Sequence, residues 1–279
     1  MATHCKLPGK VYLVGAGPGS PKLLTLRAAE VLRAADVVFH DDLVSDDVFT
    51  MIPAHVAIYS VGKRCGPKKT SQNEINRRIV AAAQNGQTVV RLKGGDPLIF
   101  GRTQEEITAL RGASIDFEIV PGITAATAAA AAAQIPLTER QGASKLVFIA
   151  NHCCAGKSKR DWHKSVAEDA TLVFYMPGSE LGTLRRELET SGLSEETPCL
   201  LISHIARPEQ KIIRTNIRNL SSLLAQPAPS LLIVGVTVTN ARADETFPPN
   251  DAVDFGSDWI GEEVSLDLSD EHQVVTRLS

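Results

Sequence analysis

Short apolar runs alternate along this chain with longer stretches of helical periodicity, and this alternation constrains the fold more than any other feature. Short runs bounded by polar or glycine positions are typical of buried strands, whereas apolar side chains at every third or fourth position are typical of helices. Their alternation predicts an α/β fold with a largely parallel sheet. In the first half, the expected strands lie at residues 11–15, 36–40, 56–62, 88–92 and 117–120.

The same pattern continues in the second half, so we expect two α/β domains. The second set of expected strands lies at 145–150, 171–176, 198–203, 210–215 and 230–238. The expected helices lie at 22–35, 71–86, 102–112, 123–134 and 179–192. Ser71 with Glu74 three residues later is the pattern of a helix N-terminal capping box.

We expect the domain boundary near residues 136–144, which gives an N-terminal α/β domain at 1–140 and a C-terminal α/β domain at 141–240. At 279 residues the chain is long enough for each domain to bury a core of its own. Beyond residue 240 the pattern fades into an acidic segment, 241–279, which we interpret as a flexible or loosely docked tail.

Composition narrows the class of protein. Hydrophobic residues make up 43% and charged residues 22%, the balance of a globular protein, and the formal net charge of -3 argues against a nucleic-acid binder. The sequence has no run long enough to cross a membrane and no signal-peptide core at its start. The five cysteines show no C-x-x-C spacing, which favours a reducing compartment, so we expect a cytoplasmic protein.

The turn GAGPGSP at residues 15–21 lies between an expected strand and an expected helix, as a dinucleotide-binding loop does. Gly15 and Gly17 have the spacing of that motif, but Ser20 stands at its third glycine and Pro18 lacks an N–H donor for a phosphate. A tight strand-to-helix turn explains the same residues. The turn alone leaves both interpretations open.

Three further loops follow expected strands of the first half: VGKRCG (61–66), RLKGGDPLIFGR (91–102) and VPGITAA (120–126). Each alone has an ordinary explanation as a turn, a helix cap or a solvated charge pair. Open α/β sheets bind ligands at the carboxyl ends of their strands, where these loops are expected to converge. Their combination of glycines with charged residues therefore favours a functional site.

Taken in order, the motifs GAGPGSPKLLTL, HDDLVS, VGKR, LKGGDPLIFGR, VPGITAA, IPLT and VFYM resemble the tetrapyrrole C-methyltransferases over about residues 10–240. Within them the chain is most similar to those that act on uroporphyrinogen III. The resemblance implies two α/β domains with a ligand cleft between them. It also implies two successive methylations by S-adenosylmethionine, which yield precorrin-2 for siroheme, cobalamin or haem d1. Because that cofactor has no phosphate, the resemblance disfavours GAGPGSP as a pyrophosphate loop.

The resemblance assigns residues to the cofactor, the substrate and the proton transfers. Asp41 matches a proton acceptor and Lys63 a proton donor, although Asp41 also suits a helix cap and Lys63 a carboxylate anchor. The resemblance aside, Met176 is better explained as a core residue at a strand end, and Glu105 is equally consistent with a first-turn helix carboxylate. The implied cofactor contacts are Pro18, Gly94, Gly95, Asp96, Ile99, Thr124, Ala125 and Met176. A substrate with many carboxylates needs cations, for which the candidates are Lys63, Arg64, Arg102 and Arg140. Of these, Arg102 and Arg140 match arginines that the family places on the substrate, and Glu105 matches an acid near it.

Some positions depart from the family pattern and keep alternatives open. Thr103-Gln104 replaces a glycine pair, Glu139 replaces a histidine, and His204-Ile205-Ala206 replaces Asn-Gly-Thr. A methyltransferase of a later corrin intermediate and a non-catalytic binding relative therefore remain alternatives, with a nicotinamide enzyme behind them. His152, Cys153 and Cys154 offer soft ligands, but adjacent cysteines rarely share one zinc, so we expect no metal. Two-domain members of the family are typically homodimers, and we expect a dimer.

Overall fold

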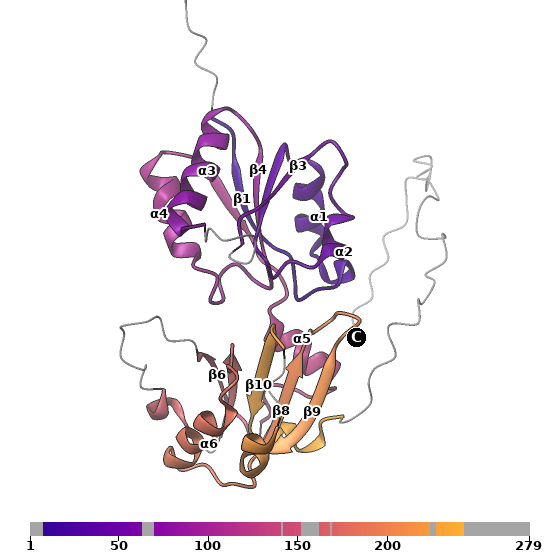
Figure 1. Ribbon diagram of the computed structural model, residues 1–279, viewed down its shortest axis with the longest axis vertical. Coiled ribbons are helices and arrows are strands. Elements are labelled where there is room, and N and C mark those ends of the chain that lie inside the picture. The colour runs from indigo at the N-terminus through magenta and orange to yellow at the C-terminus, as the bar shows by residue number, and fades with distance from the viewer. Residues whose placement is uncertain are drawn as a thin grey trace, which may run out of the picture.

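The computed structural model describes residues 8–62, 70–140, 142–151, 162–167, 169–223 and 227–242, which form two α/β units joined in the region of helix α5 (Figure 1). The first unit contains a parallel sheet in the order β3-β2-β4-β1-β5. Its strands are β1 (Val11–Gly15), β2 (Val37–His40), β3 (Ala57–Ser60), β4 (Val89–Lys93) and β5 (Phe117–Val120). Each lies within or overlaps a run expected from the sequence.

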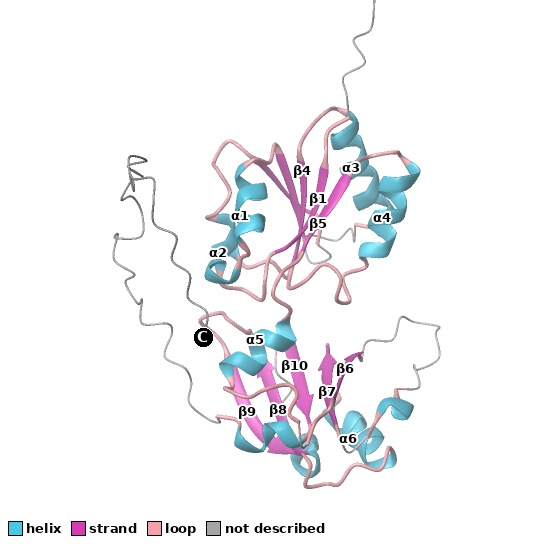
Figure 2. Cartoon of the chain, turned by 180° about the vertical axis from the view of Figure 1, so that it is seen from behind, coloured by secondary structure: helices cyan, strands magenta, loops and turns pink. Residues whose placement is uncertain are grey.

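Helices cover both faces of the first sheet because its strands are apolar on both sides. On one face, α1 (Leu26–Arg33) and α2 (Asp46–Phe49) pack against side chains such as Val14 and Val38. On the other, α3 (Gln72–Gln84) and α4 (Thr103–Gly112) pack against Val11 and Leu13, and Figure 2 shows the two helix layers on either side of the strands. Ser71 caps α3 by accepting a hydrogen bond from the Glu74 N–H.

The second unit contains a mixed sheet in the order β6-β7-β10-β8-β9. The pair β6–β7 is parallel, whereas β7–β10, β10–β8 and β8–β9 are antiparallel, so the expectation of a largely parallel sheet is wrong for this half. Residues 204–210 are too short a link for a parallel crossover, which makes β8 and β9 antiparallel neighbours. The strands are β6 (Lys145–Ala150), β7 (Ala170–Tyr175), β8 (Pro198–Ser203), β9 (Lys211–Asn216) and β10 (Ser230–Val234).

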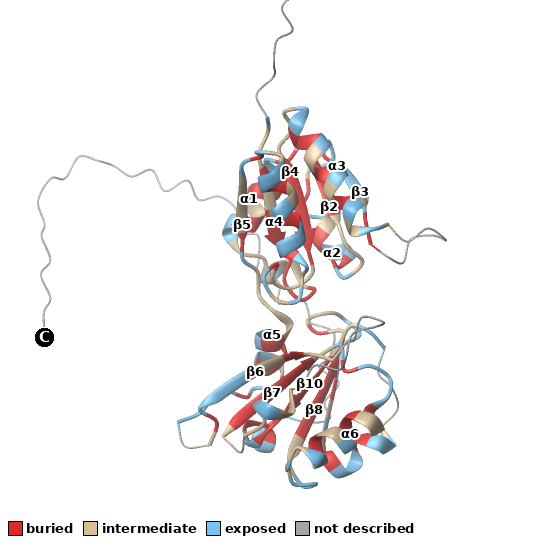
Figure 3. Ribbon diagram, turned by 90° about the vertical axis from the view of Figure 1, so that its left-hand side faces the viewer, coloured by how far each residue is buried: buried red, intermediate tan, exposed pale blue. Residues whose placement is uncertain are grey.

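Helix α5 (Ala125–Ala132) packs with the second sheet, although the expected boundary near residue 140 groups it with the first domain. Its buried alanines Ala126 and Ala129 lie against Val173, Leu200 and Leu231. Helix α6 (Leu181–Thr190) covers the opposite face of this sheet. Buried residues therefore run along the strands of both units (Figure 3), and the chain passes between the two cores just before α5.

Within the described part of the chain, no helix has the length and apolar character that a membrane crossing requires. The acidic segment 243–279 lies outside the described residues, so its interpretation as a tail stays a prediction.

Candidate functional site

The loops that follow β1, β4 and β5 meet one another, as the sequence predicts, and face the second unit. Most of the expected loop at 61–66 lies outside the described residues. Gly17, after β1, and Gly95, after β4, form a two-way backbone bridge: the Gly17 N–H donates to the Gly95 carbonyl over 3.2 Å, and the Gly95 N–H returns a bond of 2.7 Å. The Ala16 N–H donates to the Lys93 carbonyl over 2.8 Å. Because the Ala16 and Gly17 N–H groups bond to protein carbonyls, they are not available to a phosphate.

The glycines in this turn allow backbone to approach backbone. A Cβ on Gly15 would lie 2.6 Å from the Cα of Gly122, and a Cβ on Gly19 would lie 3.0 Å from the carbonyl oxygens of Ile205 and Ala206 in the second unit. Gly17 also has a φ of +71°, which favours glycine. The first loop is thus shaped by close contacts with the loop after β5 and with the second unit.

The Asp96 side chain connects the GGDP loop to the PGIT loop through a hydrogen bond. Its Oδ2 accepts a hydrogen bond of 2.9 Å from the Gly122 N–H, and its Oδ1 accepts one of 2.7 Å from the Leu98 N–H. Both carboxylate oxygens are used inside the protein, so Asp96 shapes the site by fixing these loops. Gly95, with a φ of +70°, presents its Cα face toward Thr124 and Ala125, where a Cβ would meet its nearest neighbours only at 4.0 Å.

Asp41 follows β2 and lies beside the GGDP loop. Its Oδ1 accepts from the Leu43 N–H at 3.1 Å and from the Gly94 N–H at 3.4 Å, and its Oδ2 lies 3.7 Å from Nη2 of Arg91. The bond to Leu43 closes a local turn, and the N-cap of α2 is Ser45, so the interpretation of Asp41 as a cap of the next helix is wrong. The side chain of Asp41 remains one-quarter exposed, so its carboxylate is accessible from the site.

Two cations lie buried beneath this edge of the sheet. Arg91 and Lys93 on β4 both bond to Glu106 on α4, each over 2.9 Å. Burial, and then repulsion by Arg91, lower the pKa of the Lys93 amine, while Glu106 opposes that shift. Sequence reasoning missed this cluster; charged residues inside the otherwise apolar β4 run were the available signal.

Arg102 and Glu105 form a two-pronged ion pair at the start of α4. The guanidinium donates from Nε and Nη2 to the two Glu105 oxygens, each over 2.7 Å, and both side chains are nearly half exposed. Arg102 and Phe100 have positive φ angles of 56° and 52°. Leu98 and Phe100 are exposed, whereas Ile99 is half-buried. The segment after the GGDP loop thus offers both an accessible charged pair and apolar surface.

Tyr175, at the end of β7, is a site residue that sequence reasoning missed. Its hydroxyl lies 2.6 Å from Thr124 Oγ1 and accepts a bond of 3.3 Å from the Ala126 N–H, while its ring packs edge-on against Phe100. Burial raises the pKa of Tyr175. Its neighbour Met176 is 48% exposed with a φ of 53°, so the interpretation of Met176 as a core residue is wrong.

Arg207 is a second residue that the sequence did not single out. It follows the departing segment His204-Ile205-Ala206, and its Nη2 donates to the Leu43 carbonyl of the first unit over 2.5 Å. Its Cγ would lie 2.7 Å from a Cβ on Gly19. Arg207 therefore joins the second unit to the loops after β1 and β2, at the segment where this chain departs from the family pattern.

Other expected site residues are placed differently. Lys63 and Arg64 lie outside the described residues, as do His152, Cys153 and Cys154. Arg140 is exposed on the turn closed by the Glu139–Ala143 bridge, and the contacts of the described residues do not join it to Arg102. Pro18 is buried in the first loop. Among the described residues, no three His, Cys, Asp or Glu side chains are grouped as metal ligands are.

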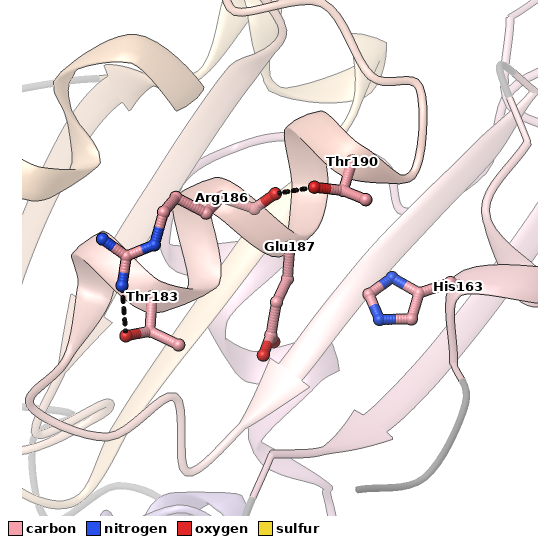
Figure 4. Close-up of a pocket in the computed structure, with 5 residues that line it drawn as sticks. All are labelled: His163, Thr183, Arg186, Glu187 and Thr190. Atoms are coloured by element: carbon pink, nitrogen blue, oxygen red, sulfur yellow. Dashed lines mark hydrogen bonds between the residues drawn. The ribbon is translucent and has the colours of Figure 1, made fainter.

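A pocket of about 250 Å³ lies elsewhere, against α6 of the second unit (Figure 4). It is lined by His163, Thr183, Arg186, Glu187 and Thr190. Arg186 bonds to Thr183, and His163 bonds to Ser191, so these side chains are engaged with the helix and its end. This pocket is separate from the loops that follow β1, β2, β4 and β5.

Comparison with known proteins matches residues 10–221 to the family model for Tetrapyrrole (Corrin/Porphyrin) Methylases. The chain is 46% identical over 228 residues to siroheme synthase of Zymomonas mobilis, covering 81% of this chain and 48% of that protein. Siroheme synthase of Photorhabdus laumondii is 44% identical over 230 residues, covering 82% and 49%. The chain thus spans about half the length of these curated relatives.

Solved structures extend the comparison. Uroporphyrin-III C-methyl transferase from Thermus thermophilus, in a crystal structure complexed with S-adenyl homocysteine, superposes with a TM-score of 0.72 at 34% identity, covering 82% of this chain and 99% of that one. A cobalt precorrin-4 methyltransferase gives a TM-score of 0.73 at 26% identity, covering 82% and 95%.

Proposed function

Because the chain belongs to the tetrapyrrole (corrin/porphyrin) methylases, we propose that it is an S-adenosylmethionine-dependent C-methyltransferase that converts uroporphyrinogen III to precorrin-2. The observation that carries this proposal is the meeting of the GAGPGSP, GGDP and PGIT loops at one sheet edge, facing the second unit. The Thermus enzyme, almost all of whose length this chain matches, is known in complex with S-adenyl homocysteine, the product of methyl transfer.

The described residues fit such a cofactor. The cofactor supplies an electrophilic methyl group on a sulfonium, flanked by an adenine and an amino-acid group. Gly95 leaves open backbone surface toward Thr124 and Ala125, and Met176 and Ile99 offer accessible apolar surface. We assign cofactor contacts to Pro18, Gly94, Gly95, Asp96, Ile99, Thr124, Ala125 and Met176. Backbone groups of the glycines and of Thr124 would bind the cofactor. The hydrogen bonds that Asp96 accepts would hold that backbone in place.

Substrate recognition is assigned to cations, because a porphyrinogen with eight carboxylates must bind to a chain of negative net charge. Arg102 is the described cation best suited to this role, since its guanidinium is accessible and already holds a carboxylate in two-pronged geometry. Glu105 accepts both of these hydrogen bonds from Arg102, so a substrate carboxylate would have to displace the Glu105 carboxylate. We also assign Lys63, Arg64 and Arg140 to substrate binding.

The residues must also move protons. Methylation of a pyrrole carbon is followed by loss of a proton from the macrocycle, and we assign its acceptance to the carboxylate of Asp41. Two backbone N–H bonds fix the Oδ1 of Asp41, and Oδ2 is the oxygen that pairs with Arg91. Lys63 is assigned as the proton donor. The exposed apolar side chains of Leu98 and Phe100 would limit the access of water to the bound macrocycle.

We also propose that the protein acts as a cytoplasmic homodimer. The cysteine pattern supports the compartment, and the dimer is supported by the family resemblance and by exposed apolar side chains such as Leu26, which is 86% exposed. Light scattering at several protein concentrations tests the dimer directly.

An anaerobic assay tests the activity. Purified protein is incubated with uroporphyrinogen III and S-adenosylmethionine, and the product mass is followed over time. We expect two successive methyl additions in the wild type and a strong loss in Arg102→Ala. Methylation of a precorrin-4-type substrate alone would identify a later corrin enzyme instead. Binding of S-adenosylhomocysteine without turnover of either substrate would identify a non-catalytic relative.

A further inference from the structure

The buried cations beneath the site are unusual because they lie inside a parallel sheet. Arg91 and Lys93 are 4% and 3% exposed, and Glu106, which they share, is 1% exposed. Charged side chains are almost never fully buried unless they are paired, and the cost of removing them from water is high. Two buried cations facing one buried carboxylate leave an excess of one positive charge.

Asp41 supplies the second negative charge. Its Oδ2 lies 3.7 Å from Nη2 of Arg91, which is an ion pair too long for a direct hydrogen bond. It also acts on Lys93, since its charge opposes the lowering of the pKa of that amine. In the described residues, Asp41 faces the cations Arg91 and Lys93 from β4, which pair with Glu106 from α4, and its chain neighbours His40 and Asp42 are also titratable.

The guanidinium of Arg91 is held rigidly. Nε bonds to Glu106 over 2.9 Å, and Nη1 donates to the carbonyls of Leu92 and Phe39 over 2.9 Å and 3.4 Å. Nη2 is then directed to Asp41. Glu106 is itself fixed by Lys93 and accepts a bond of 3.4 Å from Gln72 on α3. Guanidinium geometry is planar, so fixing two of its nitrogens fixes the third.

We propose that Arg91, locked by Glu106, is a positioning residue for Asp41, and that it sets the orientation and the electrostatic surroundings of the carboxylate that accepts the proton. The proposal rests on the proposed function for the role of Asp41 in the reaction. Arg91 does not touch the reacting atoms. It acts from beneath the site, through one oxygen of Asp41, while backbone N–H groups hold the other oxygen.

Three variants separate positioning from simple support of the fold. Arg91→Lys keeps the charge but cannot reach Glu106 and Asp41 together. Glu106→Gln keeps the shape but removes the charge that holds Arg91. Arg27→Lys is the control, because Arg27 is another arginine of this unit paired with a glutamate, Glu118, to which it bonds at 2.9 and 3.0 Å away from Asp41. Thermal unfolding and S-adenosylhomocysteine binding establish that each variant is folded.

The first readout is independent of activity. In protein labelled with ¹³C at the aspartate carboxyl carbons, the Asp41 signal is assigned by its absence in Asp41→Asn. We expect this signal to move in Arg91→Lys and in Glu106→Gln, and to stay in place in Arg27→Lys. An unchanged Asp41 signal in both folded variants would overturn the proposal, whatever the activity. If Arg91→Lys does not fold, Glu106→Gln alone decides this readout.

The second readout is a double-mutant cycle on kcat with uroporphyrinogen III. We expect Arg91→Lys to lower kcat about 10- to 100-fold while the dissociation constant of S-adenosylhomocysteine stays within about 2-fold, since misplacing a catalytic group costs rate rather than binding. In the Asp41→Asn background, the same substitution should change kcat by less than about 2-fold. Equal losses in the two backgrounds would overturn the proposal. An inactive wild type would refute the proposed function, and the carboxyl signal would still decide the role of Arg91.

Discussion

Gly15 and Gly122 lie backbone against backbone: a Cβ on Gly15 would stand 2.6 Å from the Cα of Gly122, and a Cβ on Gly122 would stand 2.8 Å from the Cα of Gly15. Gly15 ends β1, and Gly122 follows β5, so this contact joins the carboxyl ends of neighbouring strands. The Gly122 N–H also bonds to Asp96. One glycine pair thus brings three loops of the proposed site together.

Replacing Gly15 with alanine tests this contact. We expect Gly15→Ala to lower the free energy of unfolding by about 1–3 kcal/mol, because the added methyl overlaps fixed backbone rather than a mobile side chain. Urea unfolding measures the change. Gly112→Ala is the control, since a Cβ there would meet nothing within 4 Å among the described residues. It lies near the end of α4, where alanine is expected to stabilise by up to about 1 kcal/mol. Equal effects at the two positions would contradict the explanation.

The sequence predicts the positions of the strands and the convergence of the GGDP and PGIT loops, because periodicity marks the elements and parallel strands present their carboxyl ends at one edge. It does not predict partners across the fold. Tyr175 reaches Thr124 across 51 residues of sequence, and Arg91 reaches Asp41 from a neighbouring strand. Neither contact has a local pattern in the sequence.

The sequence pattern also failed to predict the antiparallel pairing in the second sheet. Apolar runs such as 198–203 read alike whether their neighbours run parallel or antiparallel, and only the length of the connections distinguishes the two arrangements. In the same way, the apolar run before Met176 favoured a core residue at a strand end. Its positive φ of 53° at the end of β7 turns the chain there and leaves the side chain exposed, which a strand pattern does not reveal.

The ion pair between Glu118 and Arg27 predicts how stability depends on pH. Hydrogen bonds from Arg27 and from Lys10, opposed by desolvation, lower the pKa of Glu118 below its ordinary value of 4.5. Because the folded-state pKa is lowered, the stabilisation is present above the unfolded value and is lost as the pH falls through the folded value. We expect Glu118→Gln to be less stable than wild type at pH 7 and equal to it below the folded-state pKa. Urea unfolding from pH 7 down to pH 3 checks this, and a constant difference would contradict it.

Tyr175→Phe tests the link between β7 and α5. The variant loses the hydrogen bonds of the hydroxyl to Thr124 and to the Ala126 N–H, and we expect the free energy of unfolding to fall by about 1–2 kcal/mol. Since Thr124 is a proposed cofactor contact, S-adenosylhomocysteine should bind several-fold more weakly. Chemical unfolding and calorimetric titration measure the two effects.

Tyr59→Phe is the control for Tyr175, because Tyr59 stacks on Phe39 at the exposed edge of the first sheet and is 51% exposed. We expect it to leave both stability and cofactor binding nearly unchanged. If Tyr175→Phe weakens stability but leaves S-adenosylhomocysteine affinity equal to that of the control, Thr124 does not contact the cofactor through its side chain.

Arg102→Lys tests substrate recognition separately from cofactor binding. Lysine keeps the charge but loses the fork that holds a carboxylate in two-pronged geometry, and hydrogen bonds to charged groups contribute about 1.5–3 kcal/mol. We therefore expect the KM for uroporphyrinogen III to rise about 10- to 100-fold while S-adenosylhomocysteine affinity stays constant. Steady-state kinetics and calorimetry measure the two quantities. Arg77→Lys, at another exposed arginine paired with a glutamate three residues away, should change neither. A rise in KM for both arginine variants would contradict a specific role of Arg102 in binding a substrate carboxylate through two hydrogen bonds.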